Sequence, residues 1–138
     1  MFDVREIRPG LALFMDADVL VAAGASCTGQ QQGRANGAHY FVCVAAERDV
    51  SDWVATSSHP GVGRVRVRSK SGHPGWVSRS TYADLWQVWT ATDDVVRRAA
   101  LAAGDASERG WRNLAALRCL FDARIVACVT EAKRDASL

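Results

Sequence analysis

Short apolar runs that favour β-structure recur along the first part of the chain, and turns rich in glycine, proline and asparagine separate them. Such runs between turn residues are typical of β-strands. The pattern predicts about five short strands, over residues 11–15, 40–44, 53–55, 64–68 and 82–89. The stretch 38–58 has the clearest strand-turn-strand pattern, with a charged connection over 47–52. We therefore expect this hairpin at the centre of a small sheet.

The hydrophobic period changes from that of a strand to that of a helix after residue 91. Thr92 can cap a helix, because its side chain can accept from a free backbone N–H, and the acids Asp93 and Asp94 suit the positive end of the helix dipole. Gly104 is expected to end this helix. A second helix is predicted from residue 105, with an apolar face at Trp111, Leu114, Leu117 and Phe121, and a third over 123–133. Strands followed by helices predict an α+β domain with a small, barrel-like sheet.

Two segments between the first strands are less clearly patterned. Residues 19–23 fit an extension of the first strand or the start of a loop. Residues 24–37 are small, polar and glycine-rich, which predicts a surface loop ending in an Asn36-Gly37 turn. Loops of that length are often functional, although a plain flexible linker fits the same composition.

Alternation within the later strands predicts which side chains share a face. Over 64–68 three arginines lie on one face and two valines on the other. Over 82–89 one face is expected to carry Tyr82, Asp84, Trp86 and Val88. Three tryptophans on apolar faces are assigned to the core rather than to base stacking: Trp53, Trp86 and Trp111.

Composition places the chain among globular proteins. With 138 residues, 49% of them hydrophobic and 23% charged, it is long enough for one hydrophobic core and too apolar for wholesale disorder. We expect a single domain over 1–138, with the barrel over about 8–91 and the helical part over about 92–133. The apolar run 19–25 is too short to cross a bilayer and the first residues lack a secretory pattern, so a cytoplasmic protein is expected.

The net charge is only +2, but its distribution is uneven. No acidic residue occurs between Asp18 and Glu47, and none between Asp52 and Asp84. These gaps contain the basic residues Arg34, Arg64, Arg66, Arg68, Lys70 and Arg79. The layout predicts an acid-free surface that binds the phosphates of a nucleic acid, or else a solvated face that acids from other segments balance.

Cysteines and histidines show no metal-site spacing. The four cysteines lack a CxxC pair and lie mostly among apolar residues, which predicts reduced, buried thiols. The three histidines do not form a pair on one helix face, so no metal and no cofactor are expected.

A few polar residues around the hairpin have the chemistry that metal-free RNA cleavage needs. That reaction requires a proton acceptor for the 2′-hydroxyl, a proton donor for the leaving 5′-oxygen and groups that stabilise the charged phosphorane. His39 is the candidate for proton transfer, Arg34 for phosphate contact, and Thr56 and Ser57 for hydroxyl donors. A structural histidine and a plain turn over 56–61 fit the same residues.

Five stretches resemble, in order, motifs of one known family. RPGLALF at 8–14 is similar to its opening RGDIW strand, and GQQQG at 29–33 to its G-x-E-Q loop. AHYFVCV at 38–44 stands where that family has RPVLVI, and WVATSS at 53–58 resembles its VxPITS strand end. LWQVWTATD at 85–93 looks like its DQIRTID strand before the C-terminal helix. By these motifs the chain resembles the MazF/PemK family of toxin endoribonucleases.

This resemblance implies an SH3-like barrel of about five strands followed by C-terminal helices. It also implies a homodimer that cleaves single-stranded RNA without metal, through attack by the 2′-hydroxyl, and that a cognate antitoxin protein neutralises. Arg34, His39, Thr56 and Ser57 would then be catalytic. RNA would be bound by Arg64, Arg66, Arg68, Lys70 and Arg79.

Two other functions stay open. Ala38 and His39 occupy the place of the family's catalytic arginine, which favours a non-catalytic barrel that binds nucleic acid or a protein partner. A cysteine hydrolase with Cys27 as nucleophile and His39 or His73 as base is the third candidate, although Cys27 is not at a predicted helix N-terminus, where a thiolate would be favoured.

Overall fold

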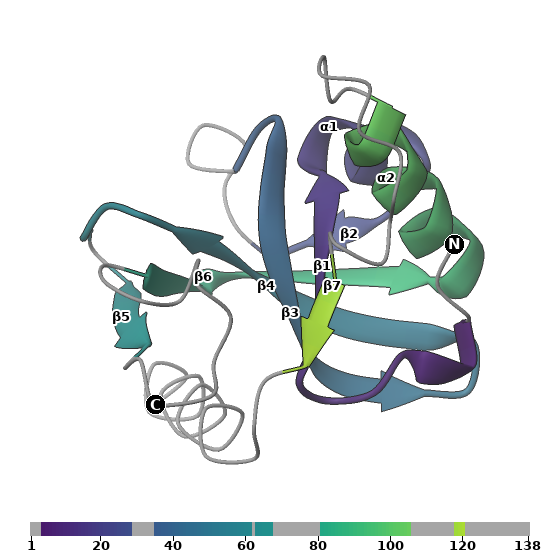
Figure 1. The fold of residues 1–138 in the computed structure, drawn as a ribbon, viewed down its shortest axis with the longest axis horizontal. Helices are drawn as coiled ribbons and strands as arrows, with labels where there is room; N and C mark the ends of the chain where they lie inside the picture. Colours follow the sequence, from purple (N-terminus) through teal and green to yellow (C-terminus); the bar gives the residue numbers. More distant parts are fainter. Residues whose placement is uncertain (1–3, 29–34, 62, 68–80, 106–117, 121–138) are drawn as a thin grey trace.

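The computed structural model describes residues 4–28, 35–61, 63–67, 81–105 and 118–120 (Figure 1). In these ranges an antiparallel sheet is combined with helices that lie together on one side of it, so the predicted α+β class is confirmed. The elements in chain order are η1 (Val4–Glu6), β1 (Leu11–Asp16), α1 (Ala17–Ala22), β2 (Ser26–Cys27), β3 (Ala38–Glu47), β4 (Val50–Ser57), β5 (Arg64–Val67), β6 (Thr81–Thr92), α2 (Asp93–Asp105) and β7 (Arg118–Leu120).

The β3–β4 hairpin lies at the centre of the sheet, as predicted. The strand order is β2-β6-β4-β3-β1-β7, and β5 also pairs with β6. Both hairpin strands are longer than the sequence pattern indicated, because Glu47 still pairs with Val50. The predicted connection over 47–52 is therefore reduced to Arg48 and Asp49, and Asp49 has a positive φ of 65°.

The described strands do not close into a barrel, contrary to the expectation from the sequence. Closure requires the two end strands of a sheet to pair with each other. Among these strands β7 pairs with β1, whereas β2 and β5 both pair with β6. The end strands are also short, with two residues in β2 and three in β7, so they offer little backbone for further pairing.

Residues 17–22 form a short helix, although the sequence suggested a strand extension or a loop nearby. Asp16 ends β1 and caps α1, and its side chain accepts from the N–H groups of Asp18 and Val19 at 2.8 and 3.2 Å. These bonds satisfy two N–H groups that a helix start leaves without partners. The N-cap chemistry of Asp16 thus outweighs the β preference of the valines that follow. Further along, within the expected loop 24–37, Ser26 and Cys27 form β2.

The helix predicted after Thr92 is confirmed as α2, and Val95 N–H points to the Thr92 hydroxyl oxygen at 3.5 Å. The prediction of a second helix is wrong at residues 118–120. These residues form β7, which pairs with Leu11–Leu13 of β1. The rest of that helix and the third helix lie outside the described residues. No helix within the described ranges has the length and apolar character needed to cross a membrane.

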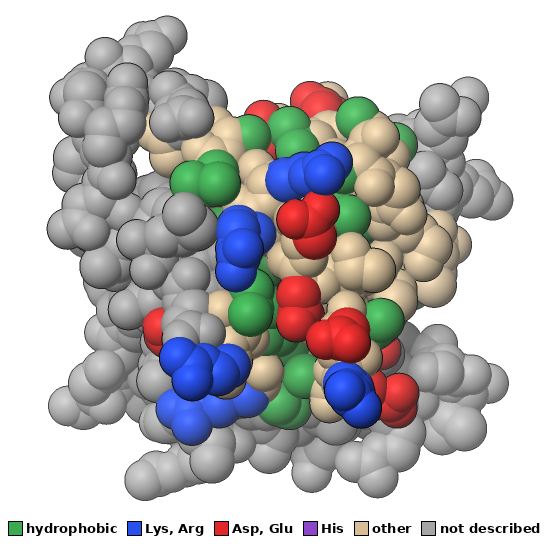
Figure 2. All heavy atoms as spheres, turned by 90° about the vertical axis from the view of Figure 1, so that its right-hand side faces the viewer, with side chains coloured by type: hydrophobic (Ala, Val, Ile, Leu, Met, Phe, Trp, Pro, Cys, Tyr) green, Lys and Arg blue, Asp and Glu red, His purple; other side chains and the backbone are tan. Residues whose placement is uncertain are grey.

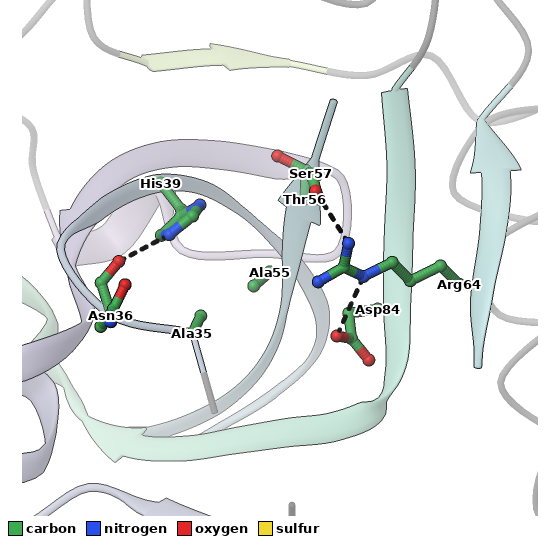
Figure 3. Close-up of a pocket in the computed structure, with 8 residues that line it drawn as sticks. All are labelled: Ala35, Asn36, His39, Ala55, Thr56, Ser57, Arg64 and Asp84. Carbon is green, nitrogen blue, oxygen red and sulfur yellow. Dashed lines mark hydrogen bonds and ion pairs between the residues drawn. The ribbon is translucent and has the colours of Figure 1, made fainter. Parts of the chain in front are cut away.

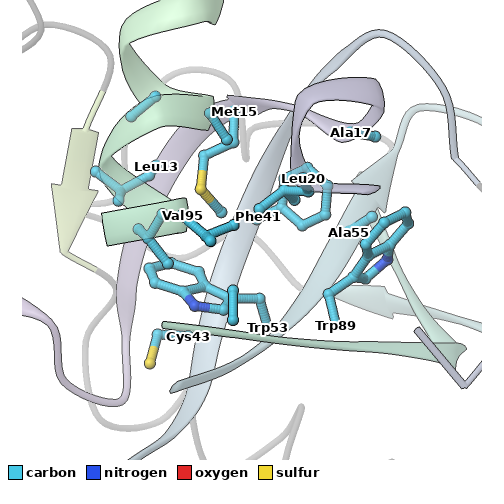
Figure 4. Packing of buried hydrophobic residues seen from close by; sticks show 14 of the residues in the cluster. Leu13, Met15, Ala17, Leu20, Phe41, Cys43, Trp53, Ala55, Trp89 and Val95 are labelled. Carbon is cyan, nitrogen blue, oxygen red and sulfur yellow. The ribbon is translucent and has the colours of Figure 1, made fainter. Parts of the chain in front are cut away.

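The core fills the space between the sheet and the helices (Figure 4). Strand side chains of one face, among them Phe41, Trp53 and Trp89, are fully buried there. The rings of Phe41 and Trp89 meet edge to face, with centroids 5.7 Å apart. The contribution of α2 comes from Val95, Val96, Ala99 and Ala100. Burial of Trp53 confirms its predicted place, whereas Trp86 is 59% exposed, so its assignment to the core is wrong.

Cys43 provides a test of this core. Its side chain is fully buried, and burial raises the pKa of the thiol to about 12. Since only the thiolate reacts with alkylating reagents, on the order of one molecule in 10⁴ is reactive at pH 8 even before access is considered. We expect Cys43 to stay unmodified by iodoacetamide in the native protein and to react fully in urea, as measured by peptide mass spectrometry. Equal labelling rates in both states would contradict the burial of Cys43.

Candidate functional site

A wide bulge in β6 shapes the site. β4 and β6 pair regularly from Val50 to Val54, but the next pair along β4 joins Thr56 to Ala83 instead of continuing from Val88. Residues 84–87 therefore have no β4 partner, and strand alternation is lost among them. This explains why Asp84 is only 8% exposed while Trp86, which was predicted to share its face, is 59% exposed.

The carboxylate of Asp84 holds the bulge together. One oxygen accepts from the backbone N–H of Trp86 at 3.2 Å, which fixes the bend within β6. The other oxygen accepts from the Gln87 amide at 3.4 Å and from Arg64 Nε at 3.5 Å. The Gln87 side-chain oxygen in turn accepts from Ala35 N–H at 2.9 Å. Asp84 thus links the bulge to β5 directly, and through Gln87 to the chain just before β3.

Arg64 of β5 is paired through its backbone with Asp84 of β6, which brings the two side chains close together. Its Nη1 donates to the Ser57 hydroxyl oxygen and to the His59 carbonyl oxygen, both at 3.2 Å. Nη2 has no hydrogen-bond partner among the described residues. Figure 3 shows this remaining nitrogen pointing into the space that separates Arg64 from His39. One guanidinium edge is therefore held in place while the other faces the pocket.

A pocket of about 170 Å³ lies between these groups (Figure 3). It forms where the open end of the β3–β4 hairpin meets β5 and the bulge of β6. Its lining residues are Ala35, Asn36, His39, Ala55, Thr56, Ser57, Arg64 and Asp84. Segments far apart in the sequence thus bring His39, Thr56, Ser57 and Arg64 around one space.

The imidazole of His39 is oriented by a backbone carbonyl. Nε2 lies 2.7 Å from the oxygen of Asn36, and a carbonyl oxygen can only accept. Nε2 therefore carries the proton, and in the neutral ring Nδ1 is the nitrogen with a free lone pair. His39 can accept a proton at Nδ1 without losing its contact to Asn36.

The two predicted hydroxyl donors differ in what they can offer. Thr56 is 7% exposed and donates its proton to the Tyr40 carbonyl at 2.8 Å, so its oxygen is left as an acceptor. Ser57 accepts from Arg64 Nη1 and from His59 N–H, both at 3.2 Å. These two bonds occupy the lone pairs of Ser57, and its own proton remains available for a ligand. Ser57 is the better placed donor of the two.

The other predicted site residues divide into two groups. Arg34, Arg68, Lys70, Arg79 and His73 lie outside the described residues. Arg66 belongs to β5, where its backbone pairs with Tyr82. Cys27 lies in β2 opposite Trp89 and is not among the residues that line the pocket with His39, so the described structure gives no support to a Cys27–His39 hydrolase.

Sequence reasoning missed Asp84 and Gln87 as site residues. Both are polar, both are at least nine-tenths buried, and both stand inside a strand that otherwise reads as apolar. Two such residues three positions apart cannot share one face of a regular strand. That conflict was the available signal for a bulge.

The predicted acid-free surface does not hold at Arg64. Antiparallel pairing of β5 with β6 places the Asp84 carboxylate against the guanidinium, so this cation is balanced by an acid from another strand. At the other end of the molecule, around α2 and the β3–β4 turn, acidic and basic side chains are intermixed (Figure 2). The visible part of that face offers no continuous basic patch.

No group of three or more histidine, cysteine or acidic side chains that could hold a metal occurs in the described ranges.

No family model, no curated protein and no solved structure matches the chain.

Substitution of Asp84 tests its structural role. In Asp84→Asn an amide replaces one oxygen, and its N–H groups then face the donors of Arg64, Gln87 or Trp86. Loss of a hydrogen-bonded buried charge predicts about 2 kcal/mol less free energy of unfolding, measured by urea denaturation.

Asp94→Asn is the matched control. This acid also pairs with an arginine, Arg98 at 3.0 Å, but both side chains are more than 60% exposed, and we expect a loss below about 1 kcal/mol. Equal losses in the two variants would show that the Asp84 contacts do not hold the bulge.

Proposed function

We propose that this protein is a metal-independent endoribonuclease that cleaves single-stranded RNA through attack by the RNA's own 2′-hydroxyl. The observation that supports the proposal best is that His39, Ser57 and Arg64 line one and the same pocket. These side chains supply an acceptor nitrogen, a hydroxyl proton and a guanidinium N–H, which are the groups this reaction uses. Thr56 adds an acceptor oxygen at the same pocket.

In the proposed reaction, the scissile phosphate lies against Arg64 Nη2 and the Ser57 hydroxyl. Nδ1 of His39 takes the proton of the 2′-hydroxyl while the 2′-oxygen forms a bond to phosphorus. The bond to the 5′-oxygen breaks, and that oxygen takes a proton from the Ser57 hydroxyl. Solvent then returns a proton to Ser57 and removes the proton that His39 had taken. The products are a 2′,3′-cyclic phosphate end and a free 5′-hydroxyl end, and no external oxidant or metal enters the balance.

The finer features of the MazF/PemK resemblance belong to the same proposal. We propose an SH3-like curvature for the sheet, supported by the order of motifs along the chain and by the central β3–β4 hairpin. A homodimer and a cognate antitoxin that covers the pocket are further expectations from that resemblance. Arg34 remains a predicted catalytic contact to phosphate, and Arg66, Arg68, Lys70 and Arg79 remain predicted RNA contacts.

Cleavage of a fluorogenic single-stranded RNA in the presence of a chelator tests the activity. We expect His39→Ala to lower the cleavage rate by about 10²- to 10⁴-fold, because the proton acceptor is lost. Ser57→Ala should lower the rate by about 10²-fold, because one donor to the developing charge is removed. The product ends should be 2′,3′-cyclic phosphates by mass spectrometry.

The neighbouring Ser58 and His59 provide matched controls. Both side chains are exposed, they bond to each other at 3.2 Å and neither lines the pocket. Ser58→Ala and His59→Ala should therefore cleave at the wild-type rate. Undiminished cleavage in His39→Ala, or no cleavage by the wild type, would reject the proposed mechanism.

Two observations favour a second function, in which the same pocket binds nucleic acid without cutting it. The Thr56 proton is engaged by Tyr40, and the charge of Arg64 is balanced by Asp84. Both contacts stabilise the structure. They also leave the pocket with fewer free hydrogen-bond donors and less net positive charge for a reacting phosphate. Binding without product formation would support this function over the first.

Salt dependence of binding separates phosphate contact from other contributions. For a 2′-O-methyl RNA, which cannot undergo the reaction, Arg64→Gln should reduce the slope of log affinity against log salt by about one. Arg98→Gln, on α2 with a side chain that is 63% exposed, should leave the slope unchanged. An unchanged slope in Arg64→Gln would mean that Arg64 does not contact phosphate.

A further inference from the structure

Trp86 is an unusually exposed aromatic side chain. Its exposed fraction is 59%, against 45% for Val21 and 38% for Val50, the other large hydrophobic side chains on the described surface. Two other tryptophans of the sheet, Trp53 and Trp89, are fully buried. The exposed indole leaves a large, flat aromatic surface available for contact with a partner.

The indole ring of Trp86 is held in place on one side. A Cβ atom added to Gly63 would lie only 2.5 Å from the ring atoms Cγ and Cδ1, so the ring packs directly on the Gly63 backbone. Gly63 also has a φ of +75°, which strains any residue with a side chain. Its carbonyl accepts from Leu85 N–H at 2.9 Å. The backbone of Trp86 is fixed as well, because its carbonyl accepts from the Thr28 hydroxyl at 3.2 Å.

The segments that hold this ring also carry residues that line the pocket. Gly63 directly precedes Arg64, whose guanidinium lines the pocket. On the other strand, the amide of Trp86 donates to the carboxylate of Asp84, another lining residue, at 3.2 Å. An open aromatic face and a guanidinium with a free N–H are therefore presented by adjacent segments of the same site.

We propose that Trp86 stacks an unpaired base of the nucleic acid whose phosphate contacts Arg64. An aromatic face beside a cation matches the base and the phosphate of a single nucleotide. Because bases inside a duplex are already stacked, such a contact selects single strands, and because every base has a π-face, it tolerates many sequences. The inference takes its substrate class from the proposed function, but it concerns binding and does not require cleavage.

Binding of a fluorescent 2′-O-methyl single-stranded RNA tests the stacking directly. Trp86→Leu should weaken binding roughly 5- to 150-fold, the range for loss of one base–aromatic stack, while Trp86→Phe keeps most of the affinity. Stacking is not an ionic contact, so Trp86→Leu should leave the salt slope unchanged, in contrast to Arg64→Gln. Val50→Ala, which alters an exposed apolar residue at the turn end of the hairpin, is the matched control and should bind as the wild type does.

The outcomes separate this inference from the proposed function. Binding that depends on Trp86, with no cleavage of unmodified RNA, supports the stacking and rejects the nuclease. Cleavage and binding that are both unchanged in a folded Trp86→Leu variant overturn the stacking alone. No measurable RNA binding by the wild type overturns both. If Trp86→Leu changes the oligomeric state in analytical ultracentrifugation and leaves RNA affinity unchanged, the ring is a protein interface and the stacking is overturned.

Discussion

The pocket depends on the buried carboxylate of Asp84. It accepts from a backbone N–H of its own bulge, from the Gln87 amide and from the Arg64 guanidinium, and Gln87 extends the connection to Ala35. A buried carboxylate needs such donors because an unpaired charge in the interior is costly. The same contacts accompany the interruption of β6 and the outward position of Trp86, and they help to hold the Arg64 side chain of β5 near Ser57 at the end of β4. Pocket wall, fixed arginine and exposed ring are therefore connected through one interaction.

This arrangement has two opposite effects on function. It positions Arg64 so that one nitrogen faces the pocket while the other donors are occupied, and it leaves the Ser57 proton available. It also places a negative charge beside the cation that a phosphate would contact. Under the proposed function, a nucleotide would therefore bind through several groups together, with His39 Nδ1 and the Trp86 ring among them, rather than through a single strong positive charge. That requirement is consistent with recognition of a whole nucleotide.

Much of the architecture could be predicted because it depends on local pattern. The apolar run at 40–44, the turn residues around it and the Thr92 cap each specify their element within a few residues, and the structure confirms them. Prediction failed where a distant partner changed the outcome. Residues 118–120 have a helical pattern but pair with β1, and Trp86 has the pattern of a core residue but lies within the bulge that Asp84 stabilises.

The amino-acid sequence by itself predicted an α+β domain with a central hairpin. It also indicated His39 as a candidate for proton transfer and Ser57 as a candidate hydroxyl donor. Local propensity and side-chain type suffice for statements of that kind. The convergence of these side chains with Arg64, the neutralising contact of Asp84 and the free proton of Ser57 came only from the folded structure. They depend on strand register and on a bulge, and both are set by hydrogen bonds between segments that lie far apart in the sequence.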